Sequence, residues 1–173
     1  MKKLFTMAMF ATAIMTGIQA CAQEDKSKRP SPPAKVTQKI KSGATISIDY
    51  SQPSVKGRTI GKDVEPMDGK IWRTGANEAT VFETDKDVTI NGKKLAAGKY
   101  GLYSLFMGED ATIIFNKTWK QWGTEYSEKD DALRIPTKYT AAATPSEKMT
   151  FKISPAGDVT LLWGNRKVDF TVN

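Results

Sequence analysis

The fold of this chain is decided by residues 149–172, which read MTFKISPAGDVTLLWGNRKVDFTV. Apolar and polar residues alternate within Met149–Ile153, Val159–Trp163 and Lys167–Val172, which is the period of a strand with one buried face. Turn-forming residues separate these runs, first at 155–158 and then at 164–165. The stretch therefore predicts three antiparallel strands joined as a meander.

The rest of the chain carries the same period of two. Thr45–Tyr50 alternates along its whole length, and Val88–Ile90 leads into Asn91-Gly92, a strong hairpin signal. Lys99–Phe106 is apolar on both faces, which predicts a central strand whose Gly101 marks a bulge or a close approach. Shorter strands are expected at 79–83, 113–115 and 133–135.

These segments together predict an all-β chain: a single antiparallel β-sandwich, or a small barrel, of about nine strands over residues 39–173. Only Lys117–Glu128 has room for a short helix, because Trp119 and Trp122 are three residues apart.

The N-terminus has the pattern of an export signal. Lys2 and Lys3 precede the apolar stretch Leu4–Ile18, which is too short to cross a bilayer, so residues 1–20 are expected to be a cleaved signal peptide. Residues 18–21 (IQAC) resemble a bacterial lipobox, which makes Cys21 the candidate lipidation site. Residues 20–22 (ACA) also fit ordinary cleavage, so free secretion stays open.

Residues 21–38 are polar and contain three prolines, and we expect them to form a flexible tether. Extended chain of this kind would hold the domain on the order of 40 Å from a membrane. The expected location is therefore the outer membrane or cell surface, through a lipid anchor only, with a periplasmic or secreted protein as the alternative.

Composition excludes several classes of function. The 173 residues contain no His and one Cys, so a Ser-His-Asp triad, a His-ligated metal and an intramolecular disulfide are ruled out. From residue 39 onward, 20 Lys and Arg stand against 17 Asp and Glu, which is too mild an excess to predict nucleic-acid binding. No metal site and no cofactor is expected.

The most unusual stretch is 69–80, which reads GKIWRTGANEAT. In a structural interpretation Trp72 fills the core, Arg73 pairs with Glu78, and Gly75 and Asn77 take left-handed turn conformations. In a functional interpretation the side chains that point into a cleft are those of seven candidate ligand-binding residues: Trp72, Arg73, Thr74, Asn77, Glu78, Lys56 and Arg58.

This stretch also carries a resemblance. Tyr50-Ser51 with Pro53, then KGR at 56–58, WRTGANEAT at 72–80, ING at 90–92 and AGKY at 97–100 closely resemble the bacterial domain-of-unknown-function family 2911. The resemblance covers about residues 30 to 172. It implies an exported protein and supplies no activity.

The leading hypothesis is an exported, lipid-anchored binding or envelope-associated module rather than an enzyme. Its partner would be a small molecule, a glycan or an envelope protein. The alternative is a small hydrolase acting on glycans without His, with Glu78 as acid or base. Trp119, Trp122 and Tyr126, with the amides of Asn116 and Gln121, have the composition of a sugar-binding surface, although two tryptophans that close one end of the sandwich explain the pattern better.

Overall fold

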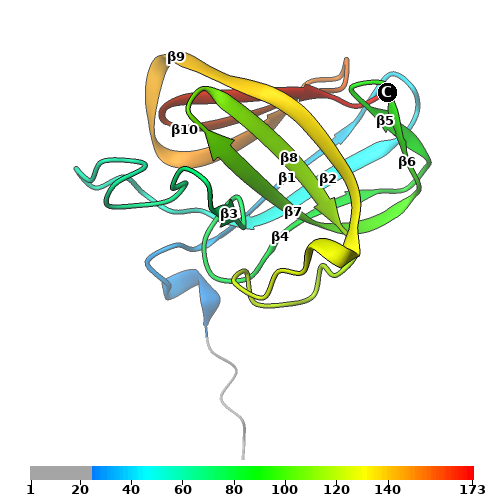
Figure 1. Cartoon of the computed structure of the whole chain (residues 1–173). Coiled ribbons are helices and arrows are strands. Elements are labelled where there is room, and N and C mark those ends of the chain that lie inside the picture. The colour runs from blue at the N-terminus through cyan, green and yellow to red at the C-terminus, as the bar shows by residue number, and fades with distance from the viewer. Residues whose placement is uncertain (1–24) are drawn as a thin grey trace, which may run out of the picture.

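Ten β-strands and two single-turn 3₁₀-helices make up residues 25–173, the part of the chain that this computed structural model describes (Figure 1). The predicted all-β class is confirmed. The elements are η1 (Lys26–Lys28), β1 (Pro33–Lys39), β2 (Thr45–Ser51), β3 (Ile71–Trp72), β4 (Thr80–Thr84), β5 (Val88–Ile90), β6 (Lys93–Leu95), β7 (Gly98–Met107), β8 (Asp110–Asn116), η2 (Glu128–Asp130), β9 (Asp131–Ile153) and β10 (Asp158–Thr171).

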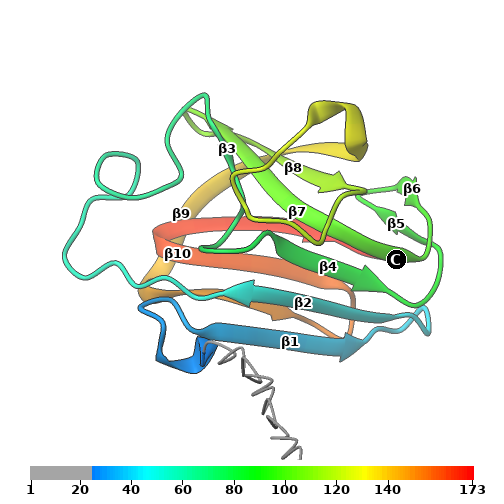
Figure 2. The ribbon, with the colours of Figure 1, turned by 90° about the horizontal axis from the view of Figure 1, so that it is seen from below.

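One curled antiparallel sheet organises the molecule, in the order β1-β2-β4-β7-β8-β9-β10, with β3 paired to β7 and β5-β6 as a separate hairpin. Figures 1 and 2 show β9 bending around the end of the sheet and β10 lying across its inner side. The segment that follows β2 pairs with β9, since Ser54 bridges Lys148 and the Met149 N–H donates to the carbonyl of Pro53. The sheet thus curls back toward its own far strands. Its shape is intermediate between the predicted sandwich and the predicted barrel.

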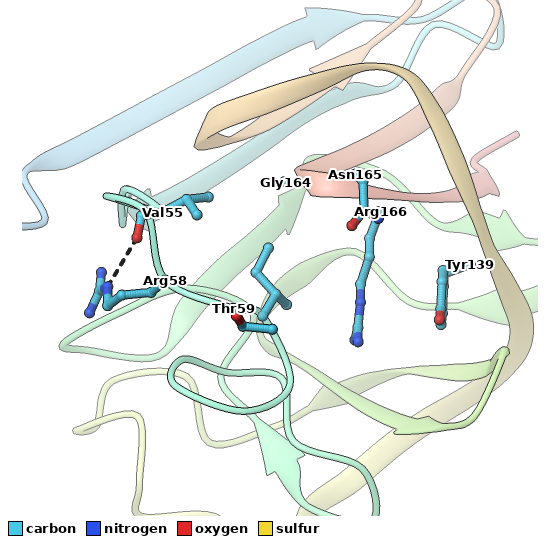
Figure 3. A pocket seen from close by; sticks show the side chains of 8 residues that line it. Val55, Arg58, Thr59, Tyr139, Gly164, Asn165 and Arg166 are labelled. Atoms are coloured by element: carbon cyan, nitrogen blue, oxygen red, sulfur yellow. Dashed lines mark hydrogen bonds between the residues drawn. The ribbon is translucent and has the colours of Figure 1, made fainter.

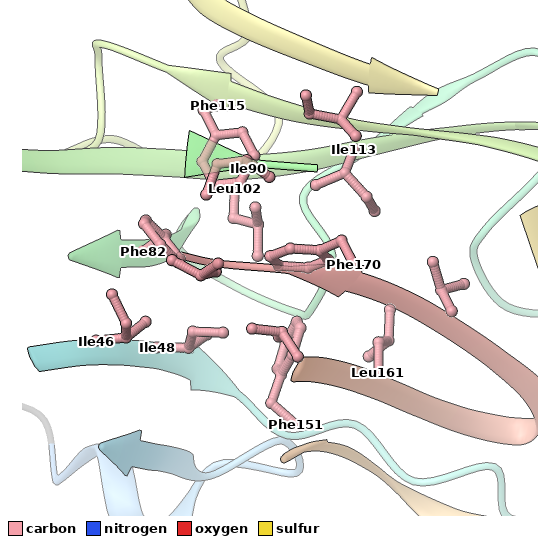
Figure 4. Packing of buried hydrophobic residues seen from close by; sticks show 14 of the residues in the cluster. Ile46, Ile48, Phe82, Ile90, Leu102, Ile113, Phe115, Phe151, Leu161 and Phe170 are labelled. Carbon is pink, nitrogen blue, oxygen red and sulfur yellow. The ribbon is translucent and has the colours of Figure 1, made fainter. Parts of the chain in front are cut away.

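The core fills the inside of this roll. Phe170 of β10 meets Phe115 of β8 edge-on at 6.0 Å, and Phe115 meets Phe82 of β4 at 5.0 Å (Figure 4). Ile48 and Leu102 from β2 and β7 are fully buried in the same cluster. Burying such side chains stabilises a fold by roughly 1.5–3 kcal/mol each, so this cluster explains why β10 is held against the sheet.

Several strands form where the alternation predicts them. β2 and β8 contain the predicted segments, and β4 begins one residue later than predicted. β5 and β6 form the predicted hairpin with Asn91 and Gly92 at φ 46° and 82°. β7 is covered on both faces, as expected. Its pairing shows no register shift, so Gly101 marks a close approach rather than a bulge: a Cβ there would lie 3.0 Å from the carbonyl oxygen of Thr118.

Two local predictions are wrong. Gly164-Asn165 does not end a strand, because β10 continues through it with a shift of register against β9. In the register of the two strands, Gly164 pairs with Ser146 and Arg166 pairs with Ala141. β9 therefore has more residues than β10 between these two pairs, and the extra residues form a bulge. The segments 133–135 and 149–153 therefore belong to one bent strand.

The predicted helix over 117–128 is also absent. Most of this segment is irregular, and only its end joins η2. Its backbone groups bond instead to the 77–79 segment: the Ala79 N–H donates to the carbonyl of Gln121, and the Gly123 N–H donates to that of Asn77. These long-range bonds replace the bonds that a helix would make.

The tether is shorter than the sequence predicts. It is expected to reach residue 38, but Pro33–Lys39 form β1, an edge strand paired with β2 along its whole length. A proline is tolerated at the first position of such a strand. The predicted signal peptide, residues 1–20, and Cys21 lie outside the described residues. Within residues 25–173 no helix is long and apolar enough to cross a membrane.

Candidate functional site

Trp72 belongs to the core. It ends β3, its side chain is buried, and its ring centroid lies 6.3 Å from that of Phe106. The indole Nε1 donates a 3.0 Å hydrogen bond to the carbonyl of Gly75, so its one polar group is satisfied inside the protein. Trp72 thus takes the structural role that the sequence analysis left open.

Thr74 is held in the same buried turn. Its hydroxyl lies 3.0 Å from that of Ser104, and its carbonyl accepts a 2.9 Å bond from the Thr80 hydroxyl. The left-handed conformation expected at Asn77 is present at φ 58°, but the second one is at Thr74 and not at Gly75. Gly75 is needed for space instead, since a Cβ there would lie 2.7 Å from the Thr80 hydroxyl.

The predicted pair of Arg73 and Glu78 does not form. Glu78 accepts hydrogen bonds from Lys26 at 2.8 Å and from Arg29 at 2.9 and 3.0 Å. Asn77 adds a 3.1 Å bond to the carbonyl of Ser31. The motif thus fastens the N-terminal segment 26–31 to the domain, and we call Asn77 and Glu78 with their three partners the N-terminal clamp.

The clamp sets the charge state of Glu78. Partial burial by itself raises the pKa of this carboxyl group, but the hydrogen bonds from Lys26 and Arg29 outweigh burial and lower the pKa to about 2. Glu78 is therefore ionised at any physiological pH.

Arg73 remains free of the clamp. Its aliphatic stem packs directly on Gly123, where any Cβ would overlap the stem. Its Nε is buried and has no hydrogen-bond partner within residues 25–173. Because an unpaired buried donor costs about 1–3 kcal/mol, this atom is a candidate contact for a ligand.

Arg73 lines a hollow of about 340 Å³, which we call the Arg73 hollow. Arg58 lines it as well, together with the carboxylates of Asp63 and Glu65. The hollow therefore presents charges of both signs. Lys56 does not line it; this side chain is exposed, and its backbone N–H donates to the Glu147 carboxylate.

A second hollow of about 350 Å³ adjoins the first, and Arg58 lines both. Arg166 of β10 and Tyr139 of β9 form part of its wall, and we call it the Arg166 hollow (Figure 3). Arg58 donates from its guanidinium to the carbonyls of Ser54 and Val55 at 2.7 and 3.0 Å. The loop that follows β2 thus separates two hollows at one end of the sheet.

A family model described as a protein of unknown function, DUF2911, matches residues 31–172. The chain belongs to the DUF2911 family. No curated protein and no solved structure matches it. The resemblance of the WRTGANEAT stretch is therefore confirmed, and the family adds no activity.

The DUF2911 match begins at Ser31, inside the N-terminal clamp. Lys26 and Arg29, the two cations on Glu78, precede the matched region. Sequence reasoning missed them because they are about fifty residues from Glu78. The positions of charged residues in a sequence do not show which acidic and basic side chains folding brings together.

Arg166 is another residue of this DUF2911 chain that sequence reasoning overlooked. The preceding Gly164-Asn165 indicated a turn, so Arg166 looked like an ordinary strand end. Gly164 lies inside β10 with φ 57°, and Ile60 packs so closely on it that any side chain would overlap. A glycine inside a strand often marks such a close approach.

The two amides expected to bind sugar hydroxyls beside the aromatic loop 117–127 make hydrogen bonds within the protein. The amide of Asn116 donates to Ser127 and Asp131, and the amide of Gln121 donates to the Tyr103 hydroxyl. Both amides are thus used inside the protein. Trp122 is 45% exposed, so it does not plug the core either.

A polar network anchors that loop to the sheet. Asp131 accepts a 2.7 Å bond from the Tyr126 hydroxyl and another 2.7 Å bond from Arg134. The pKa of Tyr126 is raised to about 12, mainly by burial of its hydroxyl group and also by the hydrogen bond to Asp131. Because Arg134 also donates to Tyr126, each of the three groups has a partner, and the network is structural.

Proposed function

We propose that this protein is an exported, lipid-anchored binding module that takes a small anionic molecule at the end of the sheet where Arg73 and Arg166 lie. One observation carries the proposal. Within residues 25–173, only two buried side-chain nitrogen or oxygen atoms lack a hydrogen-bond partner, and they are Arg73 Nε and Arg166 Nη1. Both arginines line hollows that share Arg58.

The physical reason for a ligand lies in the cost of those two atoms. Buried donors in folded proteins are nearly always paired, and unpaired ones need an explanation such as a missing ligand. Guanidinium groups bind carboxylate and phosphate oxygens through charge-assisted hydrogen bonds. An anion in these hollows would supply the missing acceptors.

Binding is favoured over glycoside hydrolysis by the state of Glu78. A general acid must hold a proton near neutral pH, which requires a raised pKa. The pKa of Glu78 is lowered to about 2, and its two oxygens accept bonds from Lys26 and Arg29. Glu78 is thus unsuited to the acid role, and we do not propose a hydrolase.

Ligand binding is tested by thermal shift of the mature chain against small carboxylates, phosphates, sulfates and neutral sugars. We expect stabilisation by anions only, reduced in Arg73→Gln or Arg166→Gln and kept in Lys152→Gln, an exposed control with the same charge change. If no anion stabilises the protein, or if all three variants respond equally, the binding proposal is wrong.

Export and anchoring are tested separately. Labelled palmitate should enter the wild-type protein in bacteria and should be absent from Cys21→Ser. Release of both proteins in soluble, unlabelled form would refute the lipid anchor and leave free secretion.

A further inference from the structure

We infer that the Arg166 hollow binds the carboxylate group of a small organic acid with an apolar body. The inference rests on the proposed binding function and names its site and ligand class. It uses Arg166, Tyr139, Ile60, Val55 and Asn165, none of which the sequence analysis selected.

Two aromatic rings lie beside the Arg166 guanidinium. Its central carbon lies 4.8 Å from the ring centroid of Tyr139 and 5.9 Å from that of Phe106. Figure 3 shows the Arg166 and Tyr139 side chains side by side at the wall of the hollow. A ring beside the face of a guanidinium leaves the N–H groups at its edge to find their own acceptors, and a carboxylate that reaches this edge can supply one.

Arg166 has no acidic partner in the part of the chain that the structure describes. Among the described residues no carboxylate lies within ion-pair distance of Arg166, and its Nη1 is buried without a hydrogen-bond acceptor. None of the residues that line this hollow is acidic. The Arg73 hollow differs, because Asp63 and Glu65 line it. Of the two hollows, the one at Arg166 therefore favours an anion more strongly.

A second cation is present but is directed elsewhere. Arg58 donates to the carbonyls of Ser54 and Val55, and in Figure 3 its guanidinium points away from Arg166. Arg58 adds positive electrostatic potential to the hollow, but its guanidinium does not offer a second pair of hydrogen-bond donors to a ligand. Phosphate and sulfate sites are usually built from several converging donors, so a single planar guanidinium suits a carboxylate better.

The remaining wall selects for an apolar body. Val55 and Ile60 contribute aliphatic surface and Tyr139 an aromatic ring, while Asn165 and Thr59 supply polar groups. The volume of about 350 Å³ lies at the lower end of the range for small-molecule sites. A monocarboxylic acid of a few carbon atoms would place its carboxylate at Arg166 and its carbon chain on these aliphatic and aromatic surfaces.

The test uses hexanoate as the probe, titrated into the mature wild-type chain and followed by calorimetry. Hexanol and inorganic phosphate serve as comparison ligands, the first without charge and the second without an apolar body. We expect hexanoate to bind at least tenfold more tightly than either. Phosphate binding as tight as hexanoate would overturn the ligand class.

Variants locate the site. Arg166→Gln should weaken hexanoate binding at least tenfold, because it removes the charge-assisted bonds. Lys167→Gln has the same charge change on the neighbouring residue, whose side chain pairs with Asp169, and should leave the affinity within twofold. Equal loss in both variants, or no loss in Arg166→Gln, would overturn the inference.

A measurement without variants guards against misfolding. Addition of hexanoate should shift the nitrogen resonances of the Arg166 side chain in the wild-type protein, and unmoved Arg166 resonances in the bound protein would refute the site. The two proposals fail differently. Anion binding that depends on Arg73 alone would overturn this inference and keep the binding function, whereas no anion binding at all would overturn both.

Discussion

Replacing Glu78 with Gln should loosen the N-terminal clamp and lower the stability of the fold. The substitution keeps the shape of the side chain and removes its charge, so the bonds from Lys26 and Arg29 lose their charge assistance. A folded-state pKa of about 2, against the ordinary 4.5, sets a ceiling of about 3 kcal/mol on the contribution of this carboxylate. Because the side chain is 37% exposed, solvent screening reduces the expected cost to about 1–2 kcal/mol at pH 7.

The pH dependence follows from the direction of the shift. A carboxyl group whose pKa is lowered on folding stabilises the fold fully above its unfolded pKa, and this contribution fades as pH falls toward the folded pKa. The difference in unfolding free energy between wild type and Glu78→Gln should therefore be constant above about pH 5. It should drop to about half its neutral value or less by pH 3.

Urea denaturation followed by tryptophan fluorescence measures both effects. Glu83→Gln is the matched control, because Glu83 forms an exposed pair with Lys99 at 3.5 Å and should cost at most about 0.5 kcal/mol. A double-mutant cycle with Arg29→Gln should show a coupling of about 1 kcal/mol. The role of the clamp is refuted if Glu78→Gln lowers the unfolding free energy no more than the control does, if this loss does not depend on pH, and if it is additive with that of Arg29→Gln. The clamp would then not hold residues 26–31.

Three further results are expected. Gly123→Ala should cost about 1–3 kcal/mol in urea denaturation, since the new methyl group overlaps the stem of Arg73 and one of them must move; an unchanged midpoint would contradict this packing. Asp131→Asn should lower the pKa of Tyr126 from about 12 toward its ordinary value, observed as tyrosinate absorbance appearing at lower pH, and an unmoved titration would mean that burial alone sets it. Gly157→Ala should prevent or strongly destabilise folding, because φ there is +97° and a Cβ would overlap a carbonyl near the chain end; a stable variant by circular dichroism would exclude this geometry for the β9–β10 turn.

Local chemistry explains which parts of the fold the sequence predicts. Alternation over 45–50 and an apolar run on both faces over 99–106 predict β2 and β7, because each strand needs only its own two faces to be specified. The Asn91-Gly92 hairpin is predicted because its turn conformation depends on those two residues alone. β1 escapes prediction since its alternating half-buried residues, such as Ala34 and Val36, lie among the prolines of an apparent tether.

The candidate site depends on contacts that no local pattern contains. Asn77 and Glu78 are rightly singled out as unusual, but their partners are in the N-terminal segment, which composition marks as a linker. The Arg166 hollow exists because the loop carrying Ile60 packs on Gly164, a contact between segments about a hundred residues apart. Charge, turn propensity and spacing identify candidate side chains, and only the closing of the sheet decides which of them face a hollow.

The N-terminal clamp also changes how the domain would stand at a membrane. A fully extended tether to residue 36 would allow on the order of 40 Å. With Lys26 held on Glu78, only the five residue steps from Cys21 remain, and they span at most about 18 Å. Ser31, which Asn77 holds, lines the Arg73 hollow. If Cys21 carries the lipid, as proposed, the clamp therefore shortens the reach of the linker by more than half, and the Ser31 wall of the Arg73 hollow would lie nearer to the bilayer than a fully extended tether would allow it to stand.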